Sequence, residues 1–63
     1  MSAAPQDRIR TLLLRSDNLL KRGRTEQALA ALEEAREVAR DPAVDPRLRE
    51  LVERRLASHR GQG

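Results

Sequence analysis

Two breaks in a regular apolar pattern constrain what this chain can fold into. Apolar residues recur at three- and four-residue spacing, which predicts amphipathic helices. The pattern is broken at Gly23 and again over residues 40–46. A glycine after a helical run favours a left-handed cap, and a proline disfavours helix at the residue before it. Because no alternating strand pattern is present, the chain is expected to be all-α with three helices.

Boundary signals place each of the three expected helices. The first runs from about residue 5 to 22 and begins at Pro5, a residue compatible with a first helical turn. The second runs from about residue 25 to 40, with Thr25 as its N-cap. The third runs from about residue 46 to 58, with Asp45 as its N-cap and Pro46 in its first turn. Residues 1–60 are therefore expected to form a single domain, and residues 61–63 a disordered tail.

The composition limits how this domain can be stabilised. The chain has 63 residues, no aromatic residue and no cysteine, so disulfides and thiolate metal sites are excluded. A chain of this size buries only about 60% of the surface that its unfolded form exposes. Such a domain usually depends on tight helix packing or on association. The thin apolar core is therefore mild evidence for self-association or a partner.

Charge is distributed unevenly along the chain. The net charge is +3, but residues 1–24 carry +4, residues 25–41 carry −3 and residues 42–63 carry +2. Neighbouring helices are therefore expected to attract one another. Twelve of the thirteen basic residues are arginines, which suits phosphate recognition. The codon bias of a GC-rich genome would produce the same ratio.

Large and small residues alternate around Gly23 as two packed antiparallel helices require. The set is Leu12, Ser16 and Leu19 before the glycine, and Ala28, Leu32 and Ala35 after it. This set resembles the tetratricopeptide repeat, a helix–turn–helix unit of about 34 residues. The resemblance covers about residues 9–42, and it departs from the family pattern at Arg15, where an apolar residue is usual.

The resemblance implies a fold and a mode of binding. One such repeat cannot bury its apolar face alone, so the helix over residues 46–58 is expected to cap the hairpin. The other open side would meet solvent, a second copy or a partner. A partner helix or peptide would use the concave side, formed largely by the first helix.

Five residues are candidates for an interaction surface. Leu14 and Leu29 lie outside the centres of their apolar stripes, although single exposed leucines are also normal. Arg8, Arg15 and Arg22 recur every seven residues and therefore lie on one side of a helix. Together these residues favour an acidic, amphipathic partner.

The arginines admit other interpretations. Arg54 and Arg55 would extend a basic strip that binds nucleic acid or another polyanion, but no aromatic residue is present to stack on a base. Alternatively the arginines form a solvated face paired with glutamates such as Glu34 and Glu37.

The sequence favours binding over chemistry. His59, the single histidine, continues the stripe of the third helix, and none of the three serines has a nucleophile setting, so no enzyme activity, cofactor or metal is expected. The N-terminus lacks the apolar core of a signal peptide, and no apolar run approaches the roughly 20 residues that span a bilayer. We therefore expect a cytoplasmic protein-interaction or self-assembly module, with a homodimer as one form. A small basic protein that binds nucleic acid is the alternative.

Overall fold

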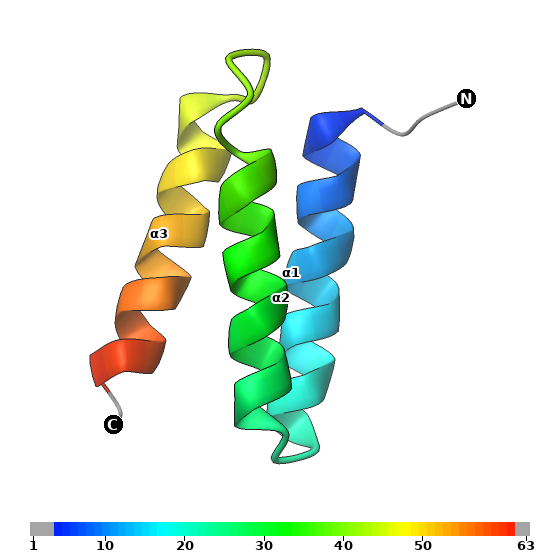
Figure 1. Cartoon of the computed structure of the whole chain (residues 1–63), viewed down its shortest axis with the longest axis vertical. Helices are drawn as coiled ribbons and strands as arrows, with labels where there is room; N and C mark the ends of the chain where they lie inside the picture. The colour runs from blue at the N-terminus through cyan, green and yellow to red at the C-terminus, as the bar shows by residue number, and fades with distance from the viewer. Residues whose placement is uncertain (1–3, 62–63) are drawn as a thin grey trace.

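The fold is all-α, as the sequence predicts. A computed structural model describes residues 4–61, and the side chains of residues 4–59. Three helices, α1 (Pro5–Lys21), α2 (Thr25–Val38) and α3 (Pro46–Gly61), make up this region, and it contains no strand (Figure 1). Gly61 thus belongs to α3 rather than to the expected tail, and residues 62–63 lie outside the described region.

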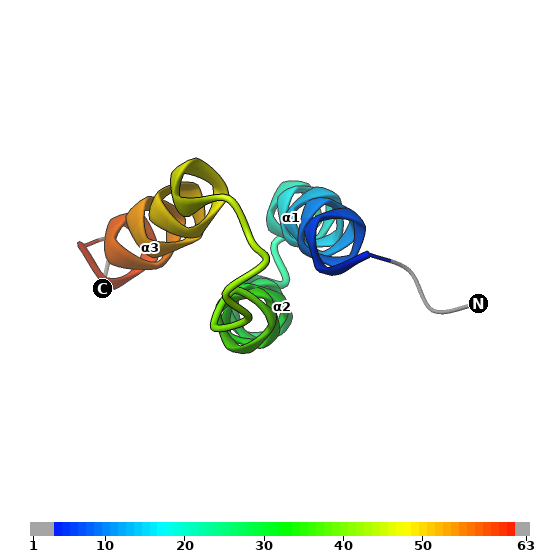
Figure 2. The same ribbon diagram turned by 90° about the horizontal axis from the view of Figure 1, so that it is seen from above.

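The helices pack as a hairpin with a third helix beside it. α1 and α2 are antiparallel and share the most extensive contact, whereas α3 packs mainly on α2 and touches α1 least. Seen end-on, the three axes form a triangle, with α1 and α3 on the same side of α2 (Figure 2). One flank of the α1–α2 hairpin is therefore left without a neighbouring helix.

The turn between α1 and α2 is the left-handed cap that Gly23 predicts. Gly23 has a φ of 76°. The Gly23 N–H donates to the Leu20 carbonyl at 3.0 Å, and the Arg24 N–H donates to the Leu19 carbonyl at 2.9 Å. This pair of bonds is a Schellman motif, which satisfies the last carbonyls of α1.

The start of α2 differs from the expectation. Arg24, not Thr25, occupies the N-cap position, and no side chain there bonds to a backbone N–H. The prediction that Thr25 caps α2 is therefore wrong. The Schellman motif explains this, because its last residue, Arg24, already leads directly into the first turn of α2.

The connection from α2 to α3 begins earlier than expected. α2 ends at Val38, two residues before the predicted Arg40. Asp45 caps α3 as predicted, since its Oδ1 accepts the Arg47 N–H at 2.9 Å. Val44 folds inward between these points and is 2% exposed, so the connection contributes to the core.

The core is aliphatic and is shared by all three helices. Ile9, Leu32 and Val52, one from each helix, are each 0% exposed. The remaining buried apolar residues are Leu12, Leu13, Ala28, Ala31, Ala35, Ala39, Val44 and Leu56. Alanines supply half of this second set, so α2 lies close to its neighbours.

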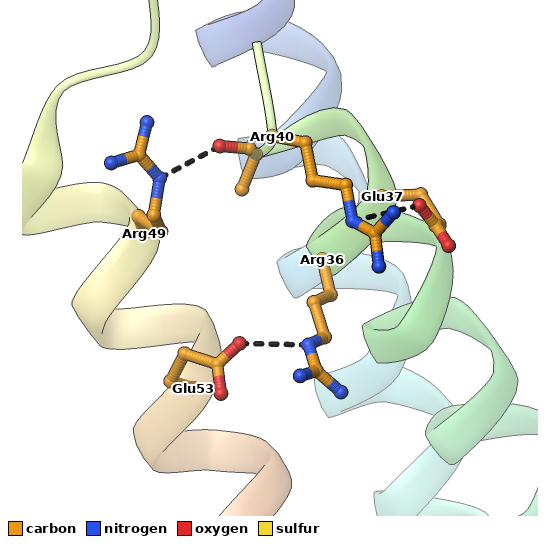
Figure 3. Close-up of polar contacts among 6 residues, drawn as sticks. Arg36, Glu37, Arg40, Arg49 and Glu53 are labelled. Atoms are coloured by element: carbon orange, nitrogen blue, oxygen red, sulfur yellow. Dashed lines mark hydrogen bonds and ion pairs between the residues drawn. The ribbon is translucent and has the colours of Figure 1, made fainter. Parts of the chain in front are cut away.

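Polar contacts attach α3 to the hairpin. Arg36 on α2 lies 2.9 Å from Glu53 on α3, measured from Nε to Oε1 (Figure 3). The Arg49 Nε–H donates to the Ala39 carbonyl at 2.8 Å, also drawn in Figure 3. A third contact joins α3 to α1, where Arg55 forms an ion pair with Asp17.

Candidate interaction surface

Most of the residues predicted to pack the hairpin are buried. Ala28, Leu32 and Ala35 are each 0% exposed. The predicted members Leu12 and Ser16 of α1 are buried, whereas Leu19 is half-buried. The Ser16 hydroxyl donates to the Leu13 carbonyl at 2.8 Å, so this small polar residue is satisfied inside the core.

The most exposed large apolar side chain in the described region lies in a hollow on α1. Leu14 is 66% exposed. The hollow around it has a volume of about 380 Å³ and is lined by Thr11, Leu14, Arg15, Asn18, Leu19 and Arg22. Two arginines and no acidic residue therefore surround one exposed leucine.

Two further hollows continue this one across the groove between α1 and α2. One is lined by Asp7, Arg8, Thr11, Leu12, Arg15 and Glu34, and the other by Arg15, Leu19, Gln27, Ala30, Ala31 and Glu34. Arg15 lines all three hollows. We call the residues that line these three hollows the α1–α2 surface.

The charges on this surface are not neutralised by ion pairs. Within residues 4–59, Arg8, Arg15, Arg22 and Glu34 form neither an ion pair nor a side-chain hydrogen bond. The expected attraction between basic α1 and acidic α2 therefore produces no ion pair between these two helices in that part of the chain. Their opposite charges remain available to a partner.

Other candidate residues lie elsewhere. Leu29 is half-buried and packs against the core, so the structure does not group it with Leu14. Arg55 is paired with Asp17, and Arg54 lies 3.6 Å from Glu50. These two arginines are on α3, so they do not extend the basic strip of α1.

His59 borders a separate, smaller hollow between α1 and α3. This hollow has a volume of about 150 Å³ and is lined by Ser16, Asp17, Leu20, Leu32, Arg55, Ser58 and His59. The His59 Nδ1 atom is buried and has no hydrogen-bond partner within the described region. Asp17, which lines the same hollow, accepts a hydrogen bond from Arg55.

Neither a metal site nor a membrane-spanning helix is found in the described region. Among residues 4–59 no three His, Asp or Glu side chains lie close enough together to hold a metal ion. None of the three helices, as far as they are described, has the length and apolar character needed to cross a bilayer.

Sequence reasoning missed the contribution of α2 to this surface. Gln27, Ala30, Ala31 and Glu34 form one wall of the groove. The seven-residue spacing of Gln27 and Glu34, with Ala30 and Ala31 between them, was the available signal. It shows that these residues share a side of the helix, but which neighbour that side meets depends on the tertiary packing.

Comparison of this chain with known protein families, with curated proteins and with solved structures found no match. The geometry and charge of the α1–α2 surface are therefore the evidence for function. The strongest features of that surface are the exposed Leu14 and the unpaired arginines beside it.

Proposed function

We propose that this protein is a non-catalytic protein-interaction module that binds an acidic, amphipathic helix on the α1–α2 surface. The observation that carries the proposal is the hollow in which Leu14, 66% exposed, lies beside Arg15 and Arg22. The resemblance of the hairpin to a tetratricopeptide repeat supports the same surface, because the first helix of such a repeat lines its binding side.

Two parts of the hollow are expected to contribute to binding: the apolar side chain of Leu14 and the arginines beside it. Burial of an exposed leucine contributes about 1.5–3 kcal/mol. Carboxylates on the partner would pair with Arg15 and Arg22, and an arginine at such a border chiefly affects the association rate and the specificity. An acidic helix with one apolar stripe meets both requirements.

Binding of a nucleic acid is the alternative that the same arginines support. Arg8 and Arg15 line one hollow together, beside Asp7 and Glu34, and Arg15 and Arg22 line another. Phosphate binding by charge alone depends steeply on salt. We favour a protein partner because the exposed Leu14 lies beside Arg15 and Arg22 and offers nothing to a phosphate backbone.

The test is a titration of a fluorescent, acidic amphipathic helical peptide, followed by anisotropy. We expect wild-type protein to bind it, and Leu14→Glu to weaken binding roughly tenfold or more, since an apolar anchor is replaced by a like charge. The double variant Arg15→Glu/Arg22→Glu should weaken binding to a similar extent.

Arg10→Glu is the matched control, because Arg10 is an exposed α1 arginine in a different hollow, between α1 and α3. Unchanged peptide binding by the Arg15→Glu/Arg22→Glu variant would refute the proposal. A single-stranded oligonucleotide of equal charge is titrated in parallel. Oligonucleotide binding that is tighter than peptide binding, and that falls steeply with added salt, would favour the nucleic-acid alternative.

A further inference from the structure

Arg15 and Glu34 line the same two hollows of the α1–α2 surface. Arg15 belongs to α1 and Glu34 to α2. Both are exposed, and neither is paired within residues 4–59. A cation and an anion thus lie on opposite walls of one groove, at the same level of the hairpin.

Such an arrangement is self-complementary. Two copies can be related by a two-fold axis that runs parallel to the helices of the hairpin. In that arrangement α1 of each copy lies over α2 of the other, and every residue keeps its level along the helix axis. Because Arg15 and Glu34 are at one level, each arginine would then meet the glutamate of the other copy. In a two-fold interface every such contact occurs twice.

We propose that a second copy of this chain binds the α1–α2 surface in this way, with two symmetric Arg15–Glu34 ion pairs. The inference rests on the proposed function, because it names α2 of the second copy as the acidic helix. The apolar stripe of α2 is buried in its own domain, so the exposed Ala30 is what α2 would offer to α1 of the other copy. The charge of the chain supports this identification, since residues 1–24 carry +4 and residues 25–41 carry −3.

The centre of the groove allows the close approach that this pairing needs. Ala30 and Ala31 line it from α2, and Leu19 lines it from α1. Small residues at a helix–helix contact let the backbones approach closely, as they do within the hairpin itself. The half-buried Leu19 and the exposed Ala30 would lose their remaining contact with water.

The size of the interface sets a further requirement. A standard interface buries about 800 Å² on each partner. That is about one sixth of this chain's surface of 4762 Å². The dimer interface must therefore include the whole α1–α2 surface, because the two ion pairs alone would bury too little area.

The test exploits the symmetry of the pairing and uses sedimentation equilibrium over a concentration series. In the Arg15→Glu variant positions 15 and 34 are both acidic. In the Glu34→Arg variant both positions are basic. We expect wild-type protein to dimerise, and each variant alone to dimerise at least roughly tenfold more weakly, because two attractive pairs become repulsive. An equimolar mixture of the two variants should recover wild-type affinity, since every pair is then opposite in charge.

Arg10→Glu and Glu33→Arg serve as controls with the same charge changes outside the α1–α2 surface, and both should dimerise like wild type. Circular dichroism verifies that all variants are helical. A mixture that stays monomeric, or controls that weaken dimerisation equally, would overturn the inference. A wild-type chain that stays monomeric but binds the acidic peptide would overturn this inference and leave the proposed function standing. Loss of both activities would reject the two together.

Discussion

Arg55 on α3 pairs with Asp17 on α1, and within residues 4–59 this is the ion pair that joins these two helices. The side chains are 36% and 41% exposed, so solvent screens the interaction in part. The pair lies at the sparsest contact of the three-helix arrangement. Because α1 and α3 share few other contacts, this ion pair helps to set the position of α3 relative to α1.

Asp17→Asn is expected to lower the free energy of unfolding by about 0.5–1 kcal/mol, because a partly exposed ion pair is lost. Urea denaturation followed by circular dichroism measures this change. Glu50→Gln removes the carboxylate of a far more exposed pair and is expected to cost about 0.3 kcal/mol or less. Equal losses in the two variants would contradict the assignment of Asp17–Arg55 as the link between α1 and α3.

Val44→Ala tests whether the connection between α2 and α3 is part of the core. Val44 is 2% exposed, so loss of its two methyl groups should cost about 2 kcal/mol in unfolding free energy. Leu14→Ala, at a side chain that is 66% exposed, should cost less than about 0.5 kcal/mol. Thermal unfolding of the two variants beside wild type separates these values. A neutral Val44→Ala would show that the connection is not packed as described.

The sequence predicts the helices and turns of this fold, but not the burial of Val44. The helix periodicity, Gly23 and Asp45 predict three helices and both turns, because each signal acts on neighbouring residues. The burial of Val44 depends instead on how residues 39–45 cross the end of the bundle. The Asp17–Arg55 pair joins residues 38 positions apart, and no local signal specifies such a contact.

The candidate surface is likewise predicted in its local features but not in its tertiary contacts. The seven-residue spacing predicted that Arg8, Arg15 and Arg22 share one side of α1. Arg8 and Arg15 line one hollow, and Arg15 and Arg22 line another. Leu29 does not join Leu14 on this surface, because Leu29 is partly buried and packs against the core. Local periodicity fixes the side of a helix, but the packing of α3 decides which side stays open.

Gly23→Ala tests the turn of the hairpin. Gly23 has a φ of 76°, and a Cβ atom there would meet nothing within 4 Å, so the cost comes from the backbone conformation and not from a clash. We expect about 1–2 kcal/mol of destabilisation by urea denaturation. Gly23→Asn should cost less, since asparagine tolerates the left-handed conformation. If alanine were as stable as glycine here, the left-handed turn would be contradicted.

Ser16 tests the close packing of the hairpin. It is 1% exposed, and its hydroxyl bonds to a carbonyl of its own helix. Ser16→Ala should therefore change the free energy of unfolding by less than about 1 kcal/mol. Ser16→Leu should cost about 1–3 kcal/mol or more, because the added methylenes overpack the contact. Stability curves for the two variants measure both effects, and a tolerated leucine would show that the space is loose.

The central claim is that the α1–α2 surface is where this protein binds its partner. Amide chemical shifts, recorded by NMR while the acidic helical peptide is added to ¹⁵N-labelled protein, test it most directly. We predict that the largest changes fall at Leu14, Arg15, Leu19, Ala30 and Glu34. Changes centred on the exposed side of α3, or a spectrum of the monomeric protein that does not respond to the peptide, would contradict the claim.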